Sequence, residues 1–243
     1  MWALYKKEIR TFLTSLIGYI VIAVYLVVTS LFLWVFPGSM NIMESEYSSL
    51  EAFFYMSPWV FLFLIPAITM RSFSEEQREG TLELLMTKPV TDLQIIFAKY
   101  LAGLTLVAIS ILPTFVYFWS VYALGAPVGN MDVGATWGSY VGLFLVASVY
   151  VAIGLFASSF SKNQIVSFLL AALLCFVMLD GFQSLGTFDL FGSLDRFIIR
   201  AGMEYHYDGM SKGLIDSREM IYFGVVTFGF ILITRLRLQA RNW

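Results

Sequence analysis

Residues 71–94, RSFSEEQREGTLELLMTKPVTDLQ, decide the fold of this chain. Acidic and basic side chains recur through the stretch, so it cannot lie in hydrocarbon. Long uncharged runs flank it on both sides. The stretch therefore predicts a polar turn between two membrane-spanning helices, on one face of a membrane.

Its first half combines a charged ridge with a break. Glu75, Glu79 and Glu83 recur every four residues, which places them on one side of a continuous helix. Gly80 and Thr81 interrupt that ridge, because glycine weakens a helix interior and threonine is a good N-cap. The pattern predicts that one helix ends here and that another begins.

The second half predicts a short helix and a sharp turn. The short helix is expected from about Leu82 to Lys88, and Pro89 stops it. The next four residues, TDLQ at 91–94, match a capping box. A further helix should therefore begin at about Asp92 and enter the membrane. By its charge alone the stretch could be a solvated loop, but a capped helix held by two spans favours a docking element.

Composition predicts an all-α polytopic membrane protein. The chain has 243 residues, of which 59% are hydrophobic and 13% charged. Spanning helices need about 20 mostly apolar residues. Six such spans are expected, with a polar element at 72–92 between the second and the third: 14–36, 53–71, 93–123, 136–159, 163–181 and 219–236.

Two further segments are expected on the membrane surface. Residues 1–13 mix Trp2 with Lys6, Lys7 and Arg10, which is typical of an amphipathic surface helix. The apolar run after it is longer than a signal-peptide core, so it predicts an uncleaved anchor. Residues 182–217 form the longest polar connection and are expected on the opposite face, as a surface or re-entrant segment.

Lysine and arginine set the expected orientation, because they are enriched on the cytoplasmic side. Four of the 15 fall within or beside the 182–217 segment: Arg196, Arg200, Lys212 and Arg218. The other eleven fall on the opposite face: Lys6, Lys7, Arg10, Arg71, Arg78, Lys88, Lys99, Lys162, Arg235, Arg237 and Arg241. Both termini and residues 72–92 are therefore predicted to be cytoplasmic.

Three single residues have a functional and a structural interpretation. Asp180 is an ionisable group in an apolar run, but its place near the end of a span favours an interfacial carboxylate. His206 is the sole histidine and is expected to be a surface residue rather than a metal ligand. Cys175 is the sole cysteine and is expected to pack in the interior or against lipid.

Spaced glycines at the start of the fourth span permit close helix approach, with a dimer contact as one alternative: Gly134, Gly138 and Gly142. No phosphate-binding GxxxxGK[ST] and no HExxH is present. The net charge of −2, without a basic block, argues against nucleic acid. Any energy should therefore come from another chain.

The chain resembles the permeases of ABC-2-type exporters. The segment EEQREGTLELLMTKPVTDLQIIFAKYLAG at 75–103 is similar to their E-x-x-x-GT-[LI]-E-L-L segment and the P-[VL]-[ST] turn after it. Further stretches resemble the gliding-motility-associated permeases of Bacteroidetes: MWALYKKE, LIGYIVI, LFLWVFPG, PWVFLFLIPAITMRSF, GSYVGLF, FASSFSKNQIVSF and LIDSREMIYF.

This resemblance implies a subunit of the bacterial inner membrane that pairs with a cytoplasmic ABC ATPase. The ATPase would bind ATP and magnesium, and this chain no cofactor. It also implies a second permease copy, or a related membrane subunit with a large periplasmic domain, and contact with membrane lipids. Residues 1–13 would be the connecting helix. Carried over by position, the coupling region would comprise Glu75, Glu76, Glu79, Gly80, Thr81, Leu82, Glu83, Leu84 and Leu85.

Two other functions remain open from the sequence. A membrane anchor that transmits force without transport would use the same docking element. A secondary transporter driven by an ion gradient would need ionisable groups near mid-membrane and commonly an internal repeat. The sequence shows neither feature, which makes the ion-driven transporter the weaker alternative.

Overall fold

The computed structural model describes residues 1–243 except 46, 83–89, 189–191, 193–194 and 241–243. In this described part of the chain every regular element is a helix. Six helical runs are long and apolar enough to cross a membrane. The all-α polytopic class expected from the sequence is thereby confirmed.

Several of the spanning runs consist of more than one helical element. The first three are α2 (Leu16–Ser30) with the π-helical turn η1 (Leu31–Val35), α3 (Glu51–Thr69) with α4 (Arg71–Glu79), and α6 (Asp92–Ile111) with η2 (Leu112–Thr114) and α7 (Phe115–Leu124). The last three are α8 (Val133–Ser158), α9 (Gln164–Phe176) with η3 (Val177–Gly181) and α10 (Phe182–Thr187), and α13 (Ser217–Gln239). Outside the spans lie α1 (Trp2–Leu13), α11 (Asp195–Ala201) and α12 (Met203–Ser211).

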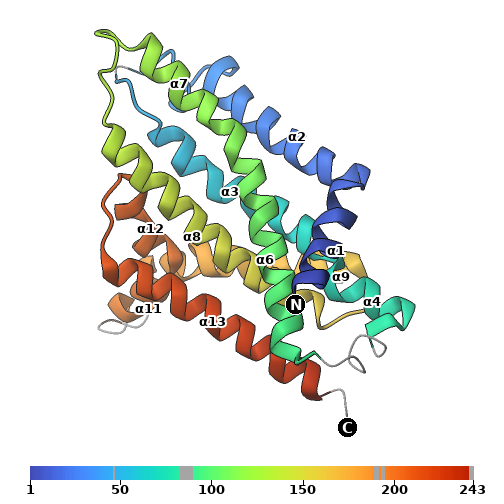
Figure 1. The fold of residues 1–243 in the computed structure, drawn as a ribbon. Helices are drawn as coiled ribbons and strands as arrows, with labels where there is room; N and C mark the ends of the chain where they lie inside the picture. The colour runs from blue at the N-terminus through green and yellow to red at the C-terminus, as the bar shows by residue number, and fades with distance from the viewer. Residues whose placement is uncertain (46, 83–89, 189–191, 193–194, 241–243) are drawn as a thin grey trace.

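Helix α8 forms the centre of the bundle. In its most apolar stretch 78% of the residues are buried, against 28% for the corresponding stretches of α2, α9 and α13. Figure 1 shows α2 and α13 on opposite sides, with α3, α6 and α8 between them. The three poorly buried spans therefore offer their apolar side chains to lipid or to another membrane subunit.

Side-chain caps define where several spans begin. Thr91 and Gln94 form the expected capping box at the start of α6. Asp132, Asn163 and Asp216 each accept a hydrogen bond from a backbone N–H in the first turn of α8, α9 and α13. These bonds satisfy donors that a helix start leaves without an intrahelical partner. The chain therefore sets these boundaries locally.

The helix of the second span, expected at 53–71, continues into the polar element. Its helix runs on from Glu51 to Glu79 as one rod of 29 residues. The extension is helical because Phe73, Ser74 and Gln77 are buried against the bundle, which stabilises it beyond its own helix propensity. Residues 72–79 of the polar element are therefore a continuation of the span, and the turn comes only after Glu79.

Different segments of the chain lie at the two ends of the bundle. Figure 1 places both termini, α4 and the start of α6 at one end. The loops between α2 and α3 and between α7 and α8 lie at the other end. We refer to these as the terminal end and the far end.

Candidate functional site

Helix α4 presents two different faces at the terminal end. Phe73 is fully buried in the core, and the side-chain amide of Gln77 donates to the carbonyl oxygen of Ser159 at 3.0 Å. Arg78 and Glu79 are exposed on the other side. Because residues four apart lie on one side of a helix, one face of α4 is fixed to the bundle while the other is free to bind.

The exposed face carries two of the predicted coupling carboxylates. Glu75 is partly exposed and forms an ion pair of 3.7 Å with Arg78 within the same helix. Glu79 is exposed one turn later. Exposed pairs of this kind contribute about 1 kcal/mol or less, so both side chains can exchange this contact for one with a partner.

A left-handed glycine ends α4. Gly80 has φ of +71°, a conformation that glycine adopts without strain. The hydroxyl of Thr81 then donates to the carbonyl oxygen of Glu76 at 3.4 Å, and Leu82 is buried. The other predicted coupling residues, Glu83, Leu84 and Leu85, lie outside the described residues, as does most of the short helix expected from Leu82 to Lys88.

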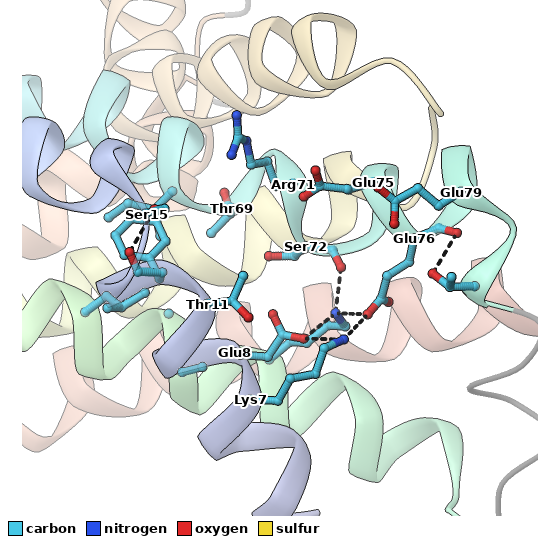
Figure 2. A pocket seen from close by; sticks show the side chains of 17 residues that line it. Lys7, Glu8, Thr11, Ser15, Thr69, Arg71, Ser72, Glu75, Glu76 and Glu79 are labelled. Atoms are coloured by element: carbon cyan, nitrogen blue, oxygen red, sulfur yellow. Dashed lines mark hydrogen bonds and ion pairs between the residues drawn. The ribbon is translucent and has the colours of Figure 1, made fainter.

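Glu76 differs from its neighbours because its carboxylate points into the protein. It accepts an ion pair from Lys99 of α6, with the ammonium nitrogen and the carboxylate oxygen 3.0 Å apart. The same ammonium is 3.0 Å from the carboxylate of Glu8 in α1 and 2.6 Å from the carbonyl oxygen of Ser72. We call these four residues, Glu8, Ser72, Glu76 and Lys99, the Lys99 cluster. Figure 2 shows Glu8 and Glu76 pointing toward each other, with dashed lines for the interactions between them and the lysines.

The Lys99 cluster is built as a buried electrostatic link. The side chain of Lys99 is 1% exposed, and its ammonium lies 5.1 Å from the centre of the Phe73 ring. A buried ammonium is stable only when paired and hydrogen-bonded, and here two carboxylates and a carbonyl oxygen supply its partners. Lys7 adds a second cation, 3.4 Å from Glu76.

The N-terminal helix is therefore more than a surface helix. One face of α1 packs along α6, where the hydroxyls of Tyr5 and Thr105 lie 2.9 Å apart. Trp2 and Lys6 remain exposed on its outer side, with the ammonium of Lys6 5.3 Å from a ring of Trp2. Helix α1 thus joins the exposed surface at the terminal end to the Lys99 cluster.

A cavity of about 390 Å³ opens between α1, α4 and α6. Glu75, Glu79 and Thr81 line it together with the Lys99 cluster, and Gly103 and Leu106 line it on the side of α6. Its walls are therefore mainly acidic toward α4 and apolar toward α6. A partner that touches α4 from outside would reach the same cavity.

The three spaced glycines of α8 differ in their surroundings. A Cβ atom added to Gly138 would lie 2.6 Å from the carbonyl oxygen of Gly213, and one added to Gly142 would lie 2.7 Å from Met210. Both glycines therefore allow α12 and the turn after it to approach α8 within one chain. Gly134 is exposed and meets only the side chain of Asp132.

The remaining candidates lie toward the far end. Asp180 sits in the turn η3 and accepts a hydrogen bond from Ser184 at 2.8 Å. Cys175 is fully buried in α9. His206 is held between two helices, with 16% of its side chain exposed, and so is not the free surface residue expected from the sequence. Among the described residues no group of three potential metal ligands occurs.

Sequence reasoning missed the central role of Lys99. Its partners Glu8 and Ser72 are 91 and 27 residues away along the chain, so no local pattern connects them. One signal was available: a lysine inside the apolar run of α6 must find a carboxylate partner or reach the surface.

The geometry can be compared with known families. A family model described as ABC-2 family transporter protein matches residues 2–188, which include α1, α4, the Lys99 cluster and the first five spans. A comparison with curated proteins gave no match.

Proposed function

The chain belongs to the ABC-2 family of transporter proteins, and on this premise we propose that it couples ATP hydrolysis in a separate cytoplasmic ATPase to work across the membrane. The family supports a permease subunit of an ABC exporter and implies such an ATPase partner. One observation carries the assignment of the coupling site. Helix α4 is fixed to three other helices on one face and exposes Glu75, Arg78 and Glu79 on the other.

In the proposed mechanism the ATPase docks on the exposed face of α4. Movement of α4 passes directly into the second span, because α3 and α4 form one helical rod. The Lys99 cluster passes the same movement to α1 and α6, and the bond from Gln77 to Ser159 passes it to the end of α8. ATP hydrolysis takes place in the partner, while this chain provides the membrane path and the mechanical connection.

The proposed setting is the bacterial inner membrane, with both termini and α4 in the cytoplasm. The distribution of lysine and arginine supports this orientation. Span burial supports a second membrane subunit, because α2, α9 and α13 leave most of their apolar residues uncovered. That subunit would be a second copy or a related chain with a large periplasmic domain. The stretches that resemble gliding-motility permeases favour work on the cell envelope.

The test is co-purification of the tagged full-length chain with a co-expressed candidate ABC ATPase, compared with Glu79→Lys. A contact to a charged rim residue is worth about 1 kcal/mol and a buried one 2–5 kcal/mol, so the reversal should weaken binding at least fivefold. Lys212→Glu is the matched control, since Lys212 is exposed at the far end. Retention of the ATPase by wild type and by both variants would overturn the docking site.

Transport and force transmission differ in a second measurement. The measurement is the rate of ATP hydrolysis by the reconstituted complex. A rate that rises when a candidate exported molecule is added indicates a transporter. A rate that rises only when the second membrane subunit is added indicates a membrane anchor that transmits force. Failure of every candidate ATPase to bind the wild-type chain would refute the whole proposal and favour an ion-driven mechanism.

A further inference from the structure

Helix α12, at the far end, carries a histidine with an unusual set of partners. Nδ1 of His206 faces the carboxylate of Glu219 in α13, and Nε2 lies 2.7 Å from the carbonyl oxygen of Arg200 at the end of α11. Both partners are acceptors, whereas a neutral imidazole has only one N–H to donate. Both bonds form together only when the ring is a protonated imidazolium.

Two aromatic rings hold His206 in place. Its ring stacks on Tyr222 of α13, with the ring centres 3.7 Å apart, and the ring of Tyr205 meets its edge at 5.3 Å. Glu219 is the charged side chain that contacts the ring from α13, and Arg200 contributes its backbone carbonyl.

Glu204, on the other side of the same helix, interacts with Asp180 of η3. Burial raises the pKa of Glu204, and the charges of Asp180 and Asp208 and a hydrogen bond with Asp180 raise it further. Two facing carboxyl groups hold one proton between them most stably. Asp180 belongs to the π-helical turn η3, and Ser184 donates to it from the other direction. Such turns within a helix are frequent at functional positions.

We propose that α12 is a proton-operated latch between the fifth and sixth spans. At acidic pH the imidazolium of His206 joins α12 to α11 and α13, and the proton shared by Glu204 and Asp180 joins it to η3. As pH rises both protons leave, and this side of α12 is released. The proposal is independent of the docking of an ATPase at the terminal end.

The rest of α12 provides a pivot for this movement. Tyr207 and Met210 are buried, and the hydroxyl of Tyr207 donates to the carbonyl oxygen of Phe54 at 2.7 Å. Met210 packs on Gly142 of α8. These contacts carry no group that changes charge near neutral pH, so they persist. Release therefore loosens α11 and the first turns of α12 while the apolar face of α12 stays on α8.

The two groups act in the same direction. His206 holds the closed latch by two hydrogen bonds to acceptors, and a neutral ring, which has one N–H, can keep only one of them. Glu204 has a raised pKa, so the closed latch favours its protonated form. Ionisation of Glu204 at higher pH therefore also opposes closure. Both protons therefore strengthen the latch at low pH, and their effects add rather than cancel.

The chain offers a direct measurement, because it has one histidine. Full-length protein with ¹⁵N-labelled histidine, carried in lipid nanodiscs and purified without a histidine tag, gives the protonation state of both ring nitrogens from one NMR signal. Hydrogen exchange of the amides at 198–206, corrected for the intrinsic effect of pH, reports the latch. Expected are two protonated nitrogens while these amides are protected, and about tenfold faster exchange once the ring is neutral.

Two variants distinguish opening of the latch from a general loss of stability. Glu204→Gln cannot ionise, so part of the protection should persist to higher pH. Lys162→Gln is the matched control, because Lys162 is exposed and lies outside α11, α12 and α13, and its exchange should follow wild type. A neutral ring in the protected state, or protection that does not change when the ring loses its proton, would overturn the proposal.

Discussion

Replacing Lys99 with methionine should separate α4 from α1. Methionine is similar to lysine in length and apolar character and lacks its ammonium group. The change deletes ion pairs of 3.0 Å to Glu8 and to Glu76 and the 2.6 Å hydrogen bond to Ser72. The two carboxylates would then lose their buried cation and keep only the exposed Lys7, at 3.9 Å from Glu8 and 3.4 Å from Glu76.

The magnitude follows from burial. Removing one partner of a buried ion pair costs about 3–5 kcal/mol. Glu8 and Glu76 retain 20% and 12% of their side-chain exposure, so water relieves part of the repulsion. We therefore expect a loss of about 3 kcal/mol, near the lower bound, which is about 150-fold in the equilibrium constant. In a chain of this size it lowers the apparent Tm by about 6–12 °C.

Thermal unfolding of the purified chain in nanodiscs measures this loss, and hydrogen exchange at residues 2–13 and 71–79 shows where it falls. The triple variant Lys99→Met with Glu8→Gln and Glu76→Gln should recover most of the stability, because no buried charge is left without a partner and the remaining Lys7 is exposed. Lys162→Met is the matched control, since Lys162 is exposed, and should change stability by less than about 0.5 kcal/mol.

Two results would refute the reasoning. One is a loss below about 1 kcal/mol in Lys99→Met, which would mean that the cluster is solvated like a surface pair. The other is a triple variant less stable than Lys99→Met, which would mean that the glutamates act through contacts other than the lysine. Unchanged exchange at 2–13 with faster exchange elsewhere would place the loss outside α1.

Three smaller predictions concern the packing and capping of the helices around the site. Gly138→Ala should cost about 1–3 kcal/mol, since its Cβ would meet the carbonyl of Gly213 at 2.6 Å, whereas Gly224→Ala, with open space around it, should be neutral or stabilising by thermal unfolding. Thr91→Ala should cost about 1 kcal/mol and raise amide exchange in the first turn of α6, because it removes the capping box; unchanged exchange would contradict this. Cys175 is fully buried, so maleimide labelling of the native chain should be negligible and should rise with unfolding; rapid native labelling would show that α9 opens.

Local features were predictable from the sequence where the physics is local. The capping box at residues 91–94 fixed the start of α6 to the residue, because its partners are three positions apart. The six spans were also predictable, because each is a continuous apolar run in the sequence. The helix end at Gly80 was predicted from glycine alone and is confirmed, whereas the burial of Phe73 and Gln77 depends on α8 and the core and could not be predicted locally.

Distant partners decide the features that could not be predicted. Glu76 looked equivalent to Glu75 and Glu79 in the sequence, yet it turns inward because Lys99 and Lys7 meet it there. His206 looked like a loop residue because Glu219 lies 13 positions later and Arg200 offers only its backbone. In both cases the decisive groups are supplied by other helices, so the periodicity of the sequence does not reveal them.

The helical run formed by α3 and α4 has a mechanical consequence. Its 29 residues extend about 43 Å at 1.5 Å per residue, while the hydrocarbon core is about 30 Å thick. About 13 Å therefore stand outside the bilayer as a rigid arm. A tilt of about 10° of the whole helical run about its Glu51 end would move its Glu79 end sideways by about 7 Å. A small tilt of this helix within the membrane therefore corresponds to a displacement of several ångströms at Glu79. A small rotation of a docked ATPase domain would be enough to produce it.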